Sequence, residues 1–210
     1  MQFKHFPEKQ GLYDSAFEHD SCGVGFVCDI KGRKSNEIIR QGLEVLRRLS
    51  HRGATGADPK TGDGAGILIQ IPHRFFTRVC AKERINLPCE GDYGTGLVFL
   101  PADKGERQYC KKVFAKFIRE EGQILLGWRN VPVDDSDIGK TAQETQPAIE
   151  QVFIGKNKKI KDQLGFERKL YVIRKRVENY IRKSELKQKQ IFYITNLSSR
   201  TISYKGLLMP

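Results

Sequence analysis

The stretch that decides the fold is residues 20–27, which read DSCGVGFV and are called the CGVG segment below. Cys22 begins a short apolar run, and Gly23 and Gly25 leave the backbone beside its thiol uncrowded. We therefore expect residues 22–30 to form a buried strand with Cys22 at its end, where a small substrate could approach closely. From composition alone, a structural role for Cys22 is the better interpretation, because buried cysteine commonly behaves as a small hydrophobic side chain.

Two further glycine-rich stretches follow: residues 49–58, which read LSHRGATGAD (the HRG segment), and residues 61–67, which read TGDGAGI (the TGDG segment). A phosphate-binding loop leads from a strand into the N-terminus of a helix. Here a helical pattern ends at the glycines and an apolar strand pattern follows. The order is wrong for a phosphate loop. Asp58 and Asp63 are expected to form turns by accepting hydrogen bonds from nearby backbone N–H groups.

Hydrophobic periodicity predicts alternating helices and strands along the chain. Helices are predicted for residues 35–48, 73–83 and 104–121, and for a basic amphipathic helix over 162–184 whose apolar stripe is Phe166, Leu170, Ile173, Val177 and Tyr180. Besides residues 22–30, strands are predicted for 64–71, 95–100, 124–128 and 148–153. Residues 191–195 and 201–207 are expected to pair with each other as a closing hairpin.

Length and composition indicate a soluble globular domain, because 210 residues with 39% hydrophobic side chains can bury a core. No apolar run reaches the roughly 18 residues of a membrane span. Residues 1–11 lack the apolar centre of a secretory signal, so we expect a cytoplasmic protein. The five cysteines form no C-x-x-C pair, and the four histidines have no zinc-type spacing. We therefore expect reduced thiols and no metal site.

The formal charge of +12 is concentrated in one segment. Residues 156–189 hold 13 Lys and Arg against four acidic residues, which accounts for nine of the twelve charges. Two interpretations stay open: a solvated helix face, or a surface for a polyanion or an acidic partner. No motif typical of nucleic-acid binding accompanies the charge, so we expect no nucleic-acid partner.

The glycine-rich segments, taken together, resemble the class II, or N-terminal-nucleophile, glutamine amidotransferases, and most of all the amidotransferase domains of glutamate synthases. The stretches SSRTI at 198–202 (the SSRT segment) and YKG at 204–206 (the YKG segment) are also similar to that family. The resemblance implies an α+β fold, the N-terminal-nucleophile hydrolase four-layer α/β/β/α sandwich. The predicted helices and strands are compatible with this fold but do not predict it by themselves.

The resemblance also implies a catalytic role for Cys22 as the mature N-terminal residue. Residues 1–21 would then be a propeptide, and residues 22–210 the N-terminal portion of the amidotransferase domain. The chemistry suits such processing, because a thiol with a pKa near 8.5 gains a base of matched strength from a free α-amino group with a pKa of about 8. Cys22 would attack L-glutamine and release glutamate and ammonia. Gly23, Arg52 and Gly53 are implied as active-site support.

Two points about this site stay open. A histidine base, His19 or His51, is the rival to the α-amino group. Arg52 either orders the turn beside the nucleophile or is a basic residue placed favourably at a helix C-terminus.

In the resembled family, an arginine, an Asn-Gly pair and an aspartate bind the substrate after the YKG segment. The sequence ends at Pro210, so we expect these groups beyond it, and we expect a fragment that is nearly inactive alone. No cofactor is expected in this segment. The resemblance implies FMN and an iron–sulfur cluster in the full-length protein, with amination of 2-oxoglutarate there.

The expected partners are L-glutamine, the remainder of the synthase chain, and a small electron-donating subunit or ferredoxin. The alternative functions are an amidotransferase domain of purine or amino-sugar biosynthesis, and a basic polyanion-binding module without catalysis.

Overall fold

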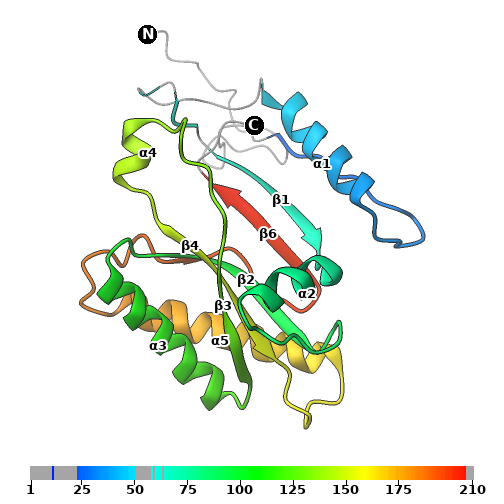
Figure 1. The fold of residues 1–210 in the computed structure, drawn as a ribbon, viewed down its shortest axis with the longest axis vertical. Helices are drawn as coiled ribbons and strands as arrows, with labels where there is room; N and C mark the ends of the chain where they lie inside the picture. The colour runs from blue at the N-terminus through cyan, green and yellow to red at the C-terminus, as the bar shows by residue number, and fades with distance from the viewer. Residues whose placement is uncertain (1–10, 12–22, 51–57, 59, 63, 207–210) are drawn as a thin grey trace.

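The computed structural model describes residues 11, 23–50, 58, 60–62 and 64–206. These residues form two antiparallel sheets and five helices (Figure 1). One sheet pairs β1 (Ala65–Gln70) with β6 (Thr201–Gly206), and the other has the order β3 (Ile124–Asn130), β4 (Ala148–Gly155), β2 (Tyr93–Leu100) and β5 (Tyr193–Ile194). The helices are α1 (Asn36–Arg48), α2 (His73–Lys82), α3 (Lys104–Glu120), α4 (Lys140–Glu144) and α5 (Gln163–Arg182).

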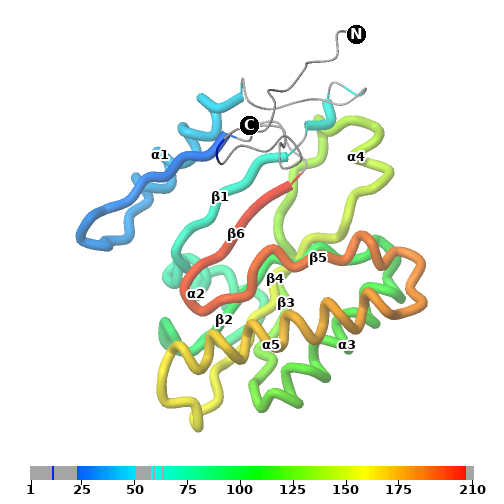
Figure 2. The backbone as a smooth tube through the Cα atoms, turned by 180° about the vertical axis from the view of Figure 1, so that it is seen from behind, coloured from blue at the N-terminus to red at the C-terminus, as the bar shows by residue number. Residues whose placement is uncertain are grey.

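The larger core lies between the four-stranded sheet and the helix pair α3 and α5, which cover one face of that sheet (Figure 2). Alternate strand residues point into this core, including Val98 and Leu100 of β2 and Val152 and Ile154 of β4. The predicted stripe of α5 is confirmed with one exception, because Ile181 is fully buried while Tyr180 is 41% exposed. Tyr180 instead packs edge-on against Phe117 of α3.

A second core lies on the opposite face of the four-stranded sheet, between it and the β1–β6 pair. Phe153 of β4 and Ile202 of β6 meet there, and α2 adds Phe76 and Cys80. Phe76 packs edge-on against Phe153 with ring centroids 5.4 Å apart. The four-stranded sheet is therefore buried on both faces.

Helix α1 lies beside β1 on the outside of the smaller sheet (Figure 1). Its boundaries are explained by Ser35, whose hydroxyl accepts from the Ile38 N–H as an N-cap, and by basic residues in the last turn. Gly42 faces the Ile67 side chain, so helix and strand approach closely. The described residues thus follow the order helix, sheet, sheet, helix, which confirms the expected α+β class.

The strand expected at 22–30 is wrong for the part that the structure describes. Residues 23–29 have no regular secondary structure, and Val24, Phe26 and Ile30 are 86%, 88% and 101% exposed. A strand needs a neighbour that supplies hydrogen bonds and cover, and none of the described strands runs beside this segment. It ends in a turn where the Asp29 carboxylate accepts from Lys31 N–H.

The expected closing hairpin is also wrong, because its two strands belong to different sheets. β5 pairs with β2 and β6 pairs with β1. The intervening residues carry the chain from one sheet to the other, and Glu167 of α5 holds them in place. Its carboxylate accepts from the Ser199 N–H at 2.6 Å and from the hydroxyls of Ser198 and Ser199. This clamp explains the serines of the SSRT segment, because they are the donors that fix the crossover.

Replacing Glu167 should loosen this crossover. We expect Glu167→Ala to lower the free energy of unfolding by about 1–3 kcal/mol, because it leaves partly buried donors without an acceptor. Urea unfolding followed by circular dichroism measures the change. Glu185→Ala is the matched control, since Glu185 is exposed. Equal stability of the two variants would show that the clamp contributes nothing.

Candidate functional site

The described parts of the glycine-rich segments gather at one end of the β1–β6 sheet. Ala65 pairs with Gly206 in the antiparallel register, so the TGDG and YKG segments are neighbours although they stand far apart in the sequence. Helix α1 runs antiparallel to β1, and residues 23–30 lie beside α1 with the opposite chain direction (Figures 1 and 2). As a result, one end of the sheet brings together the start of residues 23–30, the end of α1, the start of β1 and the end of β6 (Figures 1 and 2).

Most of the predicted site residues lie outside the described part of the chain. This holds for Cys22, Arg52, Gly53 and Asp63. Gly23 is described, and it is half-buried in the irregular segment that leads to α1. Their catalytic and supporting roles therefore stay predictions.

The structure shows why residue 25 is a glycine, which the sequence alone does not explain. A Cβ atom at this position would lie 2.6 Å from Cγ1 of Val45 in α1. Only glycine lets the chain pass this close to the helix without a shift of one or the other. Gly25 of the CGVG segment thus lets the chain pass close to Val45 of α1.

Asp58 forms the turn that was predicted for it. One carboxylate oxygen accepts from the Lys60 N–H at 3.1 Å, and the other accepts from the Thr61 hydroxyl at 3.1 Å and the Thr141 N–H at 3.4 Å. These hydrogen bonds hold the pKa of Asp58 below its usual range, and the bond from the Lys60 N–H is the largest cause. The contact with Thr141 ties the HRG segment to α4, a connection that sequence reasoning missed because no local pattern marks it.

A polar network joins the two sheets, and the sequence analysis did not predict it. Arg129 of β3 donates to the Gln151 Oε1 at 2.7 Å, and Gln151 donates from its Nε2 to the Tyr204 hydroxyl at 2.8 Å. Burial is the main cause that raises the pKa of Tyr204. Its hydroxyl therefore stays neutral, and the network anchors the YKG segment to the four-stranded sheet.

The four described cysteines are unpaired, in line with the expected reduced thiols. Cys80 and Cys110 lie in the two cores, where burial raises their pKa values to about 11 and about 12. Both are thus protonated at neutral pH and poor nucleophiles. Cys28 and Cys89 are exposed.

The described residues contain no group of three or more His, Cys, Asp or Glu side chains that could hold a metal ion. Among the helices that the structure describes, none is long and apolar enough to cross a membrane.

The chain is similar in sequence to several glutamate synthases. The chain is 49% identical over 210 residues to a glutamate synthase (NADPH) large chain of Bacillus subtilis (strain 168), which covers 100% of this chain and 13% of the relative. It is 37% identical over 209 residues to a glutamate synthase (NADH) of Schizosaccharomyces pombe, covering 97% of this chain and 10% of the relative. A ferredoxin-dependent glutamate synthase, chloroplastic, of Oryza sativa subsp. japonica is 39% identical over 191 residues, which are 91% of this chain and 12% of the relative.

The chain thus spans roughly an eighth of the length of the curated relatives it matches. The family model described as glutamine amidotransferases class-II matches residues 22–210, so the match begins at Cys22 and includes every described helix and strand. This protein belongs to the class II glutamine amidotransferases.

Proposed function

We propose that this chain is the glutaminase part of a glutamate synthase and hydrolyses L-glutamine to glutamate and ammonia. The observation that carries the proposal is the 49% identity to a glutamate synthase large chain over all 210 residues. The other relatives named above are also glutamate synthases, from a fungus and a plant. These likenesses favour a glutamate synthase over an amidotransferase of purine or amino-sugar biosynthesis.

In this proposal Cys22 is the nucleophile, and residues 1–21 are a propeptide. The start of the family match at Cys22 supports this division of the chain. Cleavage of the bond between Ser21 and Cys22 releases an α-amino group directly on the residue that carries the thiol. This amine accepts the thiol proton, because the two groups have ordinary pKa values within about one unit of each other.

The thiolate sulfur then forms a bond to the side-chain carbonyl carbon of glutamine, and the electron pair of the C=O moves to oxygen. When the tetrahedral intermediate collapses, the C–N bond breaks and the nitrogen leaves as ammonia with the proton held by the amine. Water hydrolyses the remaining γ-glutamyl thioester, which yields glutamate and restores the thiol. Gly23, Arg52 and Gly53 shape the backbone around Cys22 in this scheme.

The activity of a whole synthase is a further part of the proposal. There, the ammonia aminates 2-oxoglutarate with FMN and an iron–sulfur cluster, and electrons come from a small subunit or from ferredoxin, on which the rice relative depends by name. The described cysteines of this chain do not fit such a cluster, because no three potential ligands among the described residues lie together. We also propose a cytoplasmic location, although the rice relative is chloroplastic.

Processing of the propeptide is the first test. We expect the intact mass of the full-length protein after expression to correspond to loss of residues 1–21, with Cys22 as the N-terminal residue. Cys22→Ala is the control that removes the thiol. A full-length protein that retains residues 1–21 and still hydrolyses glutamine would refute the propeptide assignment.

The nucleophile can be identified separately with a glutamine-analogue electrophile, which binds as glutamine does and then alkylates the attacking thiol. We expect this reagent to label Cys22 in the full-length protein, as read by peptide mass spectrometry. The matched controls are Cys28→Ala and Cys89→Ala, which remove exposed thiols and should leave the labelling unchanged. Labelling that persists in Cys22→Ala would assign the nucleophile to another residue.

We further propose that residues 22–210 alone hydrolyse glutamine slowly, because the substrate-binding and oxyanion groups implied by the family are not among them. Loss of one oxyanion donor reduces kcat by about 10²–10³. Ammonia release by this segment should therefore fall at least that far below the rate of the full-length protein. Equal rates would place those groups within residues 22–210.

A further inference from the structure

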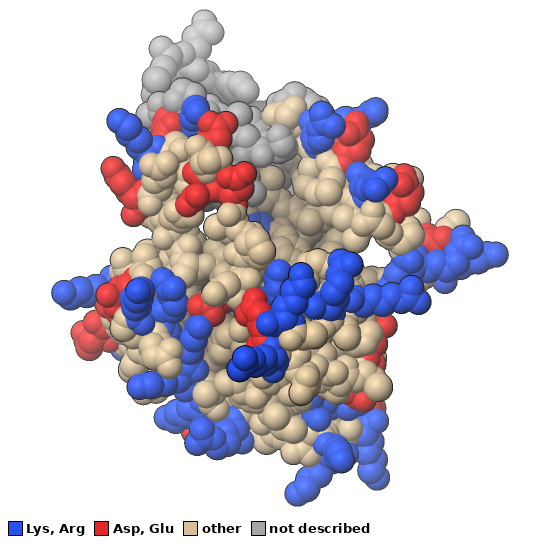
Figure 3. Space-filling view, in the orientation of Figure 1, with Lys and Arg blue, Asp and Glu red and all other residues tan. Residues whose placement is uncertain are grey.

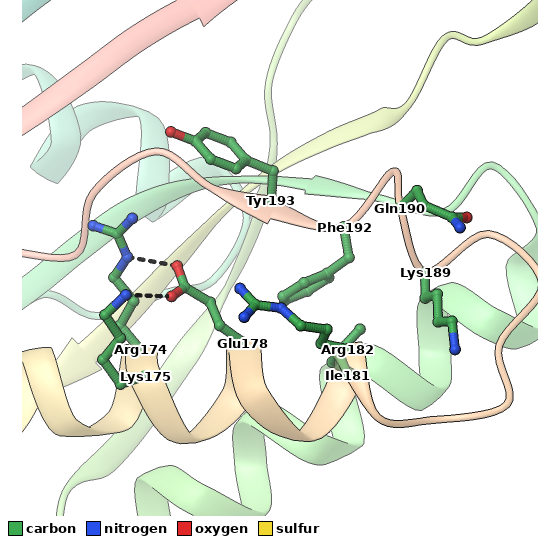
Figure 4. Close-up of a pocket in the computed structure, with 9 residues that line it drawn as sticks. All are labelled: Arg174, Lys175, Glu178, Ile181, Arg182, Lys189, Gln190, Phe192 and Tyr193. Carbon is green, nitrogen blue, oxygen red and sulfur yellow. Dashed lines mark hydrogen bonds and ion pairs between the residues drawn. The ribbon is translucent and has the colours of Figure 1, made fainter. Parts of the chain in front are cut away.

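A groove runs along α5 on the surface of the domain, apart from the end of the sheet where the glycine-rich segments gather. It has a volume of about 500 Å³ and lies between the second half of α5 and the residues that lead into β5 (Figure 4). Basic side chains line it, namely Arg174, Lys175, Arg182 and Lys189. Glu178 is the acidic residue among its lining residues.

Four of the six cations of α5 form ion pairs, on two sides of the helix, and Arg168 and Arg182 form none with the described residues. On the side that faces α3, Lys169 and Arg176 form ion pairs with Glu121, at 2.9 and 2.7 Å, and Arg176 also pairs with Glu120. These cations are matched by acidic residues at the end of α3. They stabilise the packing of the two helices and leave no excess charge for a partner.

On the side of the groove, the cations are not matched. Arg174 and Lys175 share the one carboxylate of Glu178, at 2.7 and 3.1 Å. Lys189 donates to the backbone carbonyl of Ser184, and Arg182 has no ion-pair partner in the part of the chain that the structure describes. Figure 3 shows Lys and Arg widely spread over the part of the molecule where α3 and α5 lie. Other exposed cations, such as Arg168, also lack an ion pair with the described residues, so what distinguishes the groove is that four cations line one cavity.

The floor of the groove restricts what can occupy it. Phe192 and Tyr193 are its aromatic lining residues, but the Phe192 ring packs against Phe114 of the larger core and Figure 4 shows the Tyr193 ring turned away from α5. Tyr193 stacks on Phe99 with centroids 6.1 Å apart, and the Lys205 ammonium lies 4.2 Å from the Tyr193 ring centroid. Single-stranded nucleic acids bind by stacking bases on free aromatic faces, which this groove does not offer.

The edge of the sheet favours a polypeptide. Tyr193 belongs to β5, which is the outer strand of the four-stranded sheet, and no described strand pairs with its other edge. An extended chain that lies in the groove can present carboxylates to the cations while its backbone runs beside this edge.

We propose that the groove is a docking site for an acidic polypeptide segment. One carboxylate group of the partner binds Arg182 and Lys189, and a second binds Arg174 and Lys175. Complementary charge of this kind steers association and makes it sensitive to salt.

A fluorescent hexaglutamate peptide, titrated into the full-length protein at low salt, is the probe. We expect Arg182→Glu/Lys189→Glu to weaken its binding about 10-fold or more, since each charge reversal replaces an attraction with a repulsion. The matched control is Lys104→Glu/Lys112→Glu, which changes the net charge equally at exposed residues of α3. It should weaken binding by only about 2-fold, through the long-range field alone.

If Arg182→Glu/Lys189→Glu fails to fold by circular dichroism, Arg182→Gln/Lys189→Gln replaces it with an expected loss of about 3-fold or more. Equal weakening by the groove and control variants would overturn the proposal, because general charge attraction would then explain binding. The proposal is also wrong if the peptide does not bind, or if a single-stranded oligonucleotide of equal charge binds as tightly and is weakened by the same groove variant.

Discussion

The pairing of β1 with β6 is the contact on which the arrangement of the site depends. It brings residues 65–70 beside residues 201–206 and sets Ala65 opposite Gly206. A two-stranded sheet is marginal alone, so this pair relies on what it packs against. Ile202 and Tyr204 supply that contact, the first in the apolar core with Phe153 and the second through the hydrogen bond from Gln151. The TGDG and YKG segments thus take their place from the four-stranded sheet.

The residues that support the candidate site are therefore different from those predicted to carry out its chemistry. The double-sided burial of the four-stranded sheet gives a rigid base, with α3 and α5 on one face and the smaller sheet on the other. Turns at the end of the smaller sheet are then fixed by single polar residues, as with Asp58 and its bond to Thr141. The match to the class II glutamine amidotransferases covers both the four-stranded sheet and the glycine-rich segments that it supports.

Much of the fold could be predicted from the sequence, because apolar periodicity reports burial. It located α1, α2, α3 and α5 and the strands β1 to β4 to within a few residues. It failed at residues 22–30 and at the closing hairpin, since an apolar run does not say which strand will pair with it. The same limit applies to the Arg129–Gln151–Tyr204 network and to the clamp by Glu167, whose partners come from distant parts of the chain. The candidate site came from resemblance, and its key residues Cys22, Arg52 and Gly53 lie outside the described residues.

The central claim is that Cys22 acts only when its own α-amino group is free. The most direct measurement compares glutamine hydrolysis by the processed full-length protein with that of a form, such as a Ser21→Pro variant, in which intact mass shows that the bond between Ser21 and Cys22 is uncleaved. The account predicts that the processed form releases ammonia and that the uncleaved form does not, although both contain the same thiol. Equal rates for the two forms would contradict it, because the base would then have to be another group, such as His51.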